Sequence, residues 1–410
     1  MTAVAAAATA PVLATERMAT LDAVRGVAVL GILLANIFPI SGLAFVPPGT
    51  HLPLPMASWH EPLFFLMLVL IEAKFYSLFS FLFGVGFAVF VQRAAARGAD
   101  AARLFKRRLV GLMIIGLIHT VLIWMGDILL TYAVIGFALV PFLRKGDRKV
   151  LQWAAAMLLL PILLYGLLVP TVSVAGVTPE PSEPGALPPI LAEAVAGFAA
   201  GSYADVVKGN IVFTLAQVAR RFMLMFFPRV FGMFLLGFYV GRRNIFADLD
   251  AHRPLLRRVF GWGMAIGLPL SYAGAVLEGN NMGVPSIAGL VETTVKSIGA
   301  PALALGYAAG LCLLFQRARG LRAAFAPAGQ MALTNYLLHS VAALVIFYGI
   351  GFGLFGRLPL AVVMGGAVLF FGVQMAASRA WLTRAAFGPA EWAWRTFTYG
   401  RRVPLLKGPV

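Results

Sequence analysis

Apolar segments long enough to cross a bilayer recur along the whole chain, and this pattern constrains the fold more than any other feature. Hydrophobic residues make up 60% of the 410 residues and charged residues only 12%, against about 25% charged in a typical soluble protein. A run of about 20 apolar residues crosses the hydrocarbon core as a helix. Only helices and closed barrels pair all their backbone polar groups in lipid. The sequence therefore predicts an all-α, polytopic transmembrane helical bundle.

The boundaries of these segments predict one large membrane domain. It covers residues 17–386, after a disordered Ala-rich tail over residues 1–16 and before an interfacial segment over residues 387–410. The interfacial segment mixes aromatic and charged residues, as helices that lie along a membrane surface do. About ten spans are expected, near residues 21–42, 62–92, 105–124, 128–143, 150–170, 222–241, 256–277, 297–316, 329–349 and 358–380.

The distribution of Lys and Arg predicts the orientation of the spans. The formal net charge of +17 is explained by the positive-inside rule rather than by nucleic-acid binding, because the basic residues gather in alternate connecting segments. With the N-terminus in the cytoplasm, the cytoplasmic segments include the basic stretch 93–108, whereas the external segments hold only Lys208, Lys296 and Arg357. Both termini are therefore expected in the cytoplasm, with the lipid bilayer as a partner and no nucleic acid. The oligomeric state is left open.

The first span carries polar residues along one face. Asp22, Arg25 and Asn36 are joined by apolar residues at three- and four-residue intervals, so they share a side of the helix. Lipid cannot satisfy such groups. We therefore expect this face to point into the bundle or into a water-filled cavity, with Asp22 or Arg25 paired to each other or to another helix.

Other polar residues lie within apolar segments. Glu72 and Lys74 are read either as an interfacial pair whose charges reach the membrane surface or as cavity-lining groups. Arg229, beside a proline, needs a carboxylate, a backbone carbonyl or water. Asn335 and His339 share one helix face. Their side chains either form hydrogen bonds between helices or line a second polar wall of the cavity.

His119 and Asp127 are the candidate catalytic pair, together with Asn36. Asn36 follows Arg25 by eleven residues and His119 follows Arg108 by eleven, which places both roughly 16 Å above the inner anchors at ~1.5 Å per residue. A histidine base needs an acceptor that orients it, and Asn36 could donate to an oxyanion. The alternative is a packed histidine and an aspartate that caps the next helix. Five scattered histidines and one cysteine predict no metal site.

Five motifs, taken in order, resemble the YeiB-like bacterial inner-membrane family, a domain of unknown function: LDAVRGVAVLGILLANI, EAKFYSLFSFLFGVGFAVF, IHTVLIWMGDILLTYAVIGF, GQMALTNYLLHS and FGPAEWAWRTFTYG. This resemblance implies a multi-pass protein of the bacterial inner, or plasma, membrane. Through Leu21-Asp22, Arg25-Gly26 and Asn36 the chain is also distantly similar to the membrane acyltransferase superfamily, which includes heparan-alpha-glucosaminide N-acetyltransferase.

The second resemblance implies a function. Acetyl-CoA or another acyl-CoA would be the cytosolic donor substrate, and a small molecule, a glycan or a lipid of the envelope would be the acceptor. No bound cofactor is expected. The alternatives are a transporter or flippase that uses the same polar cavity, and a structural or regulatory subunit. A catalyst needs its base and its charge-stabilising groups at one depth, whereas a transporter needs polar groups along the whole path.

Overall fold

The computed structural model describes residues 18–46, 59–174, 187–217, 226–280 and 284–407. Within these residues the regular secondary structure is helical, apart from one β-bridge between Ala385 and Leu406. The predicted tail over residues 1–16 lies outside the described residues. The helices, with two short 3₁₀ turns, are α2 (Ala19–Ile40), η2 (Leu43–Phe45), α3 (His60–Leu70), α4 (Lys74–Ala96), α5 (Ala101–Leu122), α6 (Leu129–Phe137), η4 (Val140–Arg144), α7 (Asp147–Val174), α8 (Pro189–Ala200), α9 (Tyr203–Gln217), α10 (Phe227–Arg242), α11 (Arg253–Val276), α12 (Ile287–Arg317), α13 (Arg319–Gln330), α14 (Ala332–Phe347), α15 (Leu360–Arg384) and α16 (Pro389–Tyr399).

The all-α prediction is confirmed, and the apolar helices are those of a membrane protein. Among the described residues, six helical segments are long and apolar enough to cross a membrane, or up to seven if one bent pair forms a span. The six are α2, the α3–α4 pair, α7, α11, α12 and α15, and the bent pair is α13–α14. Helix α6 has 9 residues, roughly 14 Å at ~1.5 Å per residue, which is too short to cross a ~30 Å core alone. Ten spans therefore stay a prediction.

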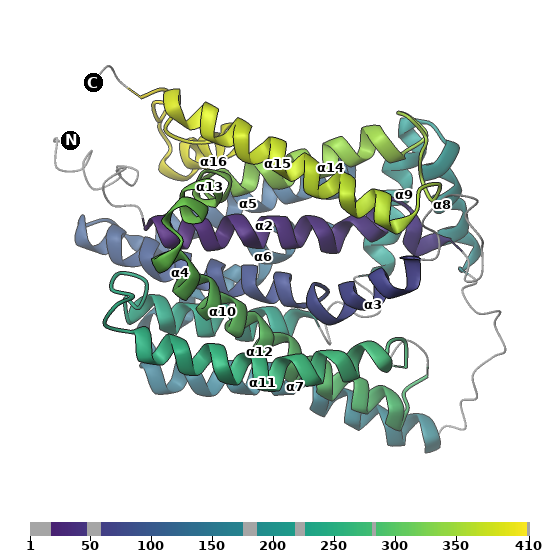
Figure 1. Ribbon diagram of the computed structural model, residues 1–410, viewed down its shortest axis with the longest axis horizontal. Coiled ribbons are helices and arrows are strands. Elements are labelled where there is room, and N and C mark those ends of the chain that lie inside the picture. The colour runs from purple at the N-terminus through teal and green to yellow at the C-terminus, as the bar shows by residue number, and fades with distance from the viewer. Residues whose placement is uncertain (1–17, 47–58, 175–186, 218–225, 281–283, 408–410) are drawn as a thin grey trace.

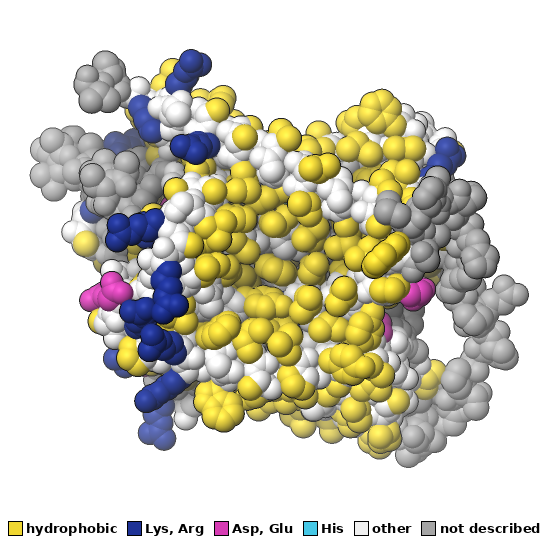
Figure 2. All heavy atoms as spheres, in the orientation of Figure 1, with side chains coloured by type: hydrophobic (Ala, Val, Ile, Leu, Met, Phe, Trp, Pro, Cys, Tyr) yellow, Lys and Arg dark blue, Asp and Glu magenta, His cyan; other side chains and the backbone are white. Residues whose placement is uncertain are grey.

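Long helices such as α2, α11 and α15 run along the long axis of the molecule, and α2 passes through the middle of the bundle (Figure 1). The start of α2 and the C-terminal helix α16 lie at the same end. Lys and Arg side chains gather along that end, and a broad belt of apolar side chains follows it (Figure 2). We call this end the basic end. Its charge and the neighbouring apolar belt are the features that the positive-inside rule describes.

Small residues let the central helices approach closely. A methyl group on Gly329 of α13 would overlap the carbonyl oxygen of Asp22 on α2. Methyl groups on Gly84 of α4 and Gly237 of α10 would overlap the facing backbone in the same way. Membrane helices associate through such close packing because apolar contacts alone do not favour protein over lipid. These crossings hold α2, α4, α10 and α13 as the centre of the bundle.

Two helices break inside the bundle. The span predicted over residues 62–92 is present as α3 and α4, separated by a turn at 71–73 in which Ala73 has φ 64°. Lys74 Nζ donates to the carbonyl oxygen of Leu68, at 2.5 Å, and so satisfies a backbone acceptor that the break leaves free. A second bend of 74° separates α13 from α14. The segment expected at 62–92 is therefore long enough to cross a membrane, as predicted, but it is interrupted by a turn.

Candidate functional site

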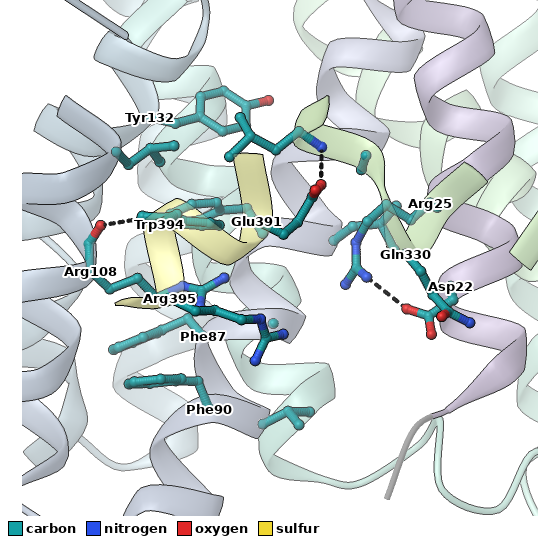
Figure 3. Close-up of a pocket in the computed structure, with 18 of the residues that line it drawn as sticks. Asp22, Arg25, Phe87, Phe90, Arg108, Tyr132, Gln330, Glu391, Trp394 and Arg395 are labelled. Carbon is teal, nitrogen blue, oxygen red and sulfur yellow. Dashed lines mark hydrogen bonds and ion pairs between the residues drawn. The ribbon is translucent and has the colours of Figure 1, made fainter. Parts of the chain in front are cut away.

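A deep cavity of about 270 Å³ enters the bundle from the basic end, between α2, α4, α5, α14 and α16. Its wall extends along α2 from Leu21 to Ile32 and along α4 from Phe79 to Arg97. These stretches correspond to roughly 17 and 27 Å at ~1.5 Å per residue. Figure 3 shows the charged part of this cavity. The lining of the cavity therefore extends along the axes of both helices.

Arginines surround the mouth of the cavity. Asp22 Oδ1 lies 2.8 Å from Arg25 Nη1, so this acidic group is already paired (Figure 3). Five guanidinium groups and two carboxylates line the cavity, which leaves an excess of positive charge suited to phosphate groups. They belong to Arg25, Arg93, Arg97, Arg108, Arg395, Asp22 and Glu391.

The C-terminal helix α16 forms one wall of this mouth. Trp394 Nε1 donates to the carbonyl oxygen of Arg108 at 2.7 Å, and the Arg108 guanidinium lies 3.7 Å from the centre of the Trp394 ring (Figure 3). Glu391 Oε1 accepts from the backbone N–H of Leu333 at 2.7 Å, and Glu391 Oε2 accepts from Thr334 Oγ1 at 2.6 Å. Burial raises the pKa of Glu391. Helix α16 is thus docked to α5 and to the start of α14, rather than resting on lipid alone.

The inner part of the cavity is aromatic. Phenylalanines at three- and four-residue intervals form a stripe along one face of α4: Phe79, Phe83, Phe87 and Phe90. Tyr132 Oη is 2.6 Å from Ser80 Oγ and donates to the carbonyl oxygen of Tyr76 at 2.9 Å. An apolar pocket with a few placed polar groups is the usual environment of an organic ligand. The cavity therefore suits an amphiphile with an anionic head and an apolar arm.

The predicted pair of His119 and Asp127 meets behind the inner end of the cavity. His119 Nδ1 lies 2.8 Å from Asp127 Oδ2, and both side chains are 1% exposed. The contact is short but not aligned as a hydrogen bond, and His119 Nε2 has no partner among the described residues. Tyr336 lines the cavity, its ring centre 5.2 Å from that of His119, and its hydroxyl donates to Asp127 Oδ2 at 3.5 Å. Tyr336 is therefore the member of this group that faces the cavity.

The capping role of Asp127 is also present. Asp127 Oδ1 accepts from the backbone N–H of Leu130 at 2.6 Å, at the start of α6. One carboxylate oxygen thus caps α6, while the other faces His119 and Tyr336. The two interpretations of Asp127 do not exclude each other, because each uses a different oxygen.

The first-helix residues divide between two environments. Asp22 and Arg25 line the cavity mouth. Asn36 is half-buried and does not belong to the cavity lining, since Ile32 is the last α2 residue there. The equal heights of Asn36 and His119 inferred from the sequence therefore do not make them neighbours in one cavity.

The other intramembrane polar residues lie elsewhere. Glu72 and Lys74 flank the α3–α4 break, away from the cavity lining. His339 Nε2 contacts Gln374 Oε1 at 2.7 Å, and Asn335 Nδ2 donates to Ser378 Oγ at 3.1 Å. These bonds link α14 to α15, as the helix-to-helix interpretation describes.

Arg229 is buried near the start of α10, at 8% exposure. Its Nε has no hydrogen-bond partner among the described residues. Among those residues, no group of three or more His, Cys, Asp or Glu side chains is placed to hold a metal ion.

Sequence reasoning missed the main feature of the site, which is the arginine-lined mouth. Arg93 and Arg97 were interpreted only as positive-inside residues, although they lie four apart on the face that carries Phe79 and Phe83. This spacing was the available signal. No sequence pattern indicated that Glu391 would be buried against α14, because its partners Leu333 and Thr334 lie far along the chain.

The comparisons with known proteins identify the family. The family model described as "Protein of unknown function (DUF418)" matches residues 240–401. The chain is 31% identical to the uncharacterised protein YxaH of Bacillus subtilis (strain 168), over 97% of this chain and 98% of that protein. It is 30% identical to the uncharacterised protein YeiB of Escherichia coli (strain K12), over 95% and 98%.

A third relative extends this set. The uncharacterised 39.9 kDa protein in the amylase 3' region of Bacillus acidopullulyticus is 32% identical, over 97% of this chain and 98% of that protein. Each match extends over almost the entire length of the relative. The chain belongs to the YeiB-like family.

Proposed function

We propose that the protein is a membrane acyltransferase that passes an acyl group from a cytosolic acyl-CoA to an acceptor of the cell envelope. One observation carries this proposal. An arginine-lined, aromatic cavity leads from the basic end of the bundle to Tyr336, which contacts the buried pair of Asp127 and His119.

The cavity matches the chemistry of the donor. Coenzyme A carries several phosphate charges at one end and a long pantetheine arm with the reacting sulfur at the other. The arginines of the mouth bind the phosphates through charge-assisted hydrogen bonds. The phenylalanine stripe of α4 accommodates the arm, and the thioester reaches Tyr336. The cavity wall along α4, from Phe79 to Arg97, is roughly 27 Å long, which is more than an extended pantetheine arm needs.

The acceptor hydroxyl attacks the thioester carbon, and the carbon–sulfur bond breaks. The hydroxyl proton moves through the phenol of Tyr336 and the carboxylate of Asp127 to His119, and it returns to the leaving thiolate to form free coenzyme A. Asp127 also orients the imidazole of His119. Asn36 lies one turn beyond the last α2 residue of the cavity lining, so it has no part in this step. The acceptor is a small molecule, a glycan or a lipid.

The distribution of Lys and Arg supports the proposed location and orientation of the protein in the membrane. The protein resides in the bacterial inner membrane as a multi-pass protein, with ten spans and both termini in the cytoplasm. The basic residues at the end where α2 begins and α16 lies (Figures 1 and 2) support this orientation. Labelling of single cysteines near residues 98, 280 and 405 from either side of the membrane tests it. An external residue 405 contradicts it.

The decisive experiment measures binding and turnover by the purified protein in nanodiscs. Acetyl-CoA and longer acyl-CoA donors are expected to bind more tightly than the corresponding acyl-pantetheine, and the binding to weaken with salt. Release of free coenzyme A is expected to rise when envelope lipids and glycans are added as acceptors. Equal binding of the phosphate-free donor, or no release of coenzyme A with any acceptor, contradicts the proposal.

A transporter or flippase is the second candidate. It is favoured by the charged cluster at the far end of α4, around Lys74 and Lys296, because a transport path needs polar groups on both sides of the membrane. Reconstituted vesicles separate the two functions. Translocation of a substrate without any change in its covalent structure favours transport, whereas acyl release favours transfer.

A further inference from the structure

A second hollow lies on the surface of the bundle at the basic end, between the start of α5 and the C-terminal helix α16. Its volume is about 420 Å³. We call it the surface groove, and its lining consists of Asp100, Ala102, Arg103, Lys106, Arg107, Val110 and Phe397. None of these residues lines the cavity. The groove is therefore a separate site.

The basic residues at the start of α5 divide between two faces of this helix. Leu104 and Arg108 face the cavity, whereas Arg103, Lys106 and Arg107 line the surface groove and are exposed. Residues three and four positions apart lie on the same side of a helix, so the three cations share one face. The positive-inside rule accounts for basic residues at this depth, but it requires neither a groove nor a common face.

The end of α16 holds the side chain of Arg107 in place. Arg107 Nη2 donates to the carbonyl oxygen of Phe397 at 3.1 Å. Gly400 ends α16 with φ 65°, and a methyl group on it would overlap the guanidinium of Arg107. The last carbonyl groups of a helix carry partial negative charge, which favours a cation there. A cation that is already positioned loses less side-chain freedom when a ligand binds.

The other wall of the surface groove is apolar. Phe397 is exposed to the outside of the bundle, and a methyl group on Gly111 of α5 would overlap its ring. The ring therefore packs directly on α5. Val110 is half-buried and lies in the groove one turn after the cations. The groove thus combines a charged part at the start of α5 with an apolar part next to it, as the membrane interface requires of an amphiphile's binding site.

The same face of α5 continues as an apolar stripe. Ile114, Leu117 and Ile118 follow Val110 at three- and four-residue intervals and are 44%, 53% and 51% exposed. From Arg107 to Ile118 the helix rises roughly 16 Å at ~1.5 Å per residue, about half of the ~30 Å hydrocarbon core. The stripe therefore has the length of one leaflet. A lipid would cover both the cations and the stripe, whereas a soluble anion would leave the stripe uncovered.

The surface groove carries a net positive charge. Its single carboxylate, Asp100, accepts from the backbone N–H of Arg103 at 3.0 Å and so caps α5. Three cations and one carboxylate leave two positive charges in excess among the lining residues. Guanidinium and ammonium groups bind phosphate through charge-assisted hydrogen bonds. They would repel the ammonium group of a zwitterionic headgroup, so the groove favours a phospholipid of net negative charge.

We propose that the surface groove binds the headgroup of an anionic phospholipid from the leaflet at the basic end. The phosphate lies between Arg103, Lys106 and Arg107, and one acyl chain follows the apolar stripe of α5. The site does not depend on the proposed acyl transfer. Helix α16 borders both the groove and the cavity mouth, so a bound lipid supports the wall of the mouth from outside.

Lipid titration of the purified protein in detergent, followed by native mass spectrometry, tests the site without any acyl donor. Phosphatidylglycerol and phosphatidylethanolamine with identical chains are the probes. The wild type is expected to bind phosphatidylglycerol several-fold more tightly. Arg103→Gln combined with Lys106→Gln should weaken this binding about tenfold, because each basic residue near a membrane surface attracts anionic lipid. Both side chains are exposed, so the melting temperature should stay unchanged.

Two controls separate the groove from other sources of binding. Arg257→Gln combined with Arg258→Gln removes two exposed arginines from the start of another apolar helix, α11, and should keep wild-type affinity. Inorganic phosphate and the chain-free headgroup glycerophosphoglycerol should not displace the lipid. The proposal is overturned if the two lipids bind equally well or if the Arg103 and Lys106 double variant binds like the wild type. Equal weakening in the α11 variant, or displacement by either soluble phosphate, also overturns it.

Discussion

The charged side chains at the two ends of helix α4 are arranged differently. At the basic end, arginines line an open cavity of about 270 Å³ with guanidinium groups in excess. At the far end, lysines and glutamates surround a void of about 10 Å³ and are largely paired with one another. A ligand has room to enter beside the arginines, whereas the paired charges at the far end hold helices together. Charged residues in the bundle therefore differ in role according to the volume next to them.

The largest expected effect concerns the chemistry at the closed end of the cavity. His119→Gln and Asp127→Asn preserve size and most hydrogen bonding but remove the base and its charged partner. Each should lower turnover by about 10²–10⁴-fold, the usual contribution of general base catalysis, with acyl-CoA affinity within about twofold of the wild type. Coenzyme A release under saturating donor measures this. Full turnover by both variants, inserted normally, removes the catalytic assignment.

A stability comparison separates a buried ion pair at the far end of α4 from an exposed ion pair elsewhere in the chain. Lys296→Met leaves the buried carboxylate of Glu292 without its partner at 2.7 Å, and breaking a buried pair costs about 3–5 kcal/mol. The matched control is Lys208→Met, which removes an ion pair of the same 2.7 Å length whose side chains are 64% and 68% exposed. Thermal melts in detergent should show a large loss for the first variant and no measurable change for the second. Equal losses of melting temperature in the two variants would mean that the burial of an ion pair does not determine how much it stabilises the protein.

A smaller effect is expected at the cavity mouth. Arg93→Gln combined with Arg97→Gln removes two phosphate-binding charges and should weaken acyl-CoA binding about tenfold, which corresponds to about 1.4 kcal/mol. The control is Arg257→Gln, an exposed arginine outside the cavity lining, which should keep wild-type affinity. Isothermal titration at two salt concentrations measures both. An equal loss in the control would point to a general surface field rather than to the cavity.

The smallest effect is a pH dependence of stability at Glu391. Burial raises the pKa of this carboxyl group in the folded protein, so its contribution to stability is complete below the unfolded pKa. That contribution is lost as the pH rises through the raised, folded value. Glu391→Gln mimics the protonated form and should flatten the dependence. The melting temperature of the wild type should therefore fall by a few degrees relative to the variant between acidic and neutral pH, and parallel curves would contradict the assignment.

Local sequence patterns predicted the positions of helices more successfully than the residues that line the cavity. Helix α2 begins and ends within two residues of the span expected at 21–42, because apolar length alone defines such a helix. The closeness of His119 and Asp127 was also anticipated, since the two residues bracket a single turn between helices. The exclusion of Asn36 from the cavity was not anticipated, because helix rise gives height along the membrane but not the rotation of one helix against another.

The sequence by itself determined the class of this protein: an all-helical membrane chain with basic residues gathered at one end. Composition and periodicity are sufficient for that, since lipid accepts only segments that pair their own backbone groups. Tertiary structure alone decided where α3–α4 and α13–α14 break, which charges face a cavity, and which are paired. The break before Lys74 depends on an acceptor in the preceding helix. The first turn after the α13–α14 bend is capped by Glu391, which lies 58 residues from Leu333. Such partners are brought together only by packing, so no local pattern could identify them.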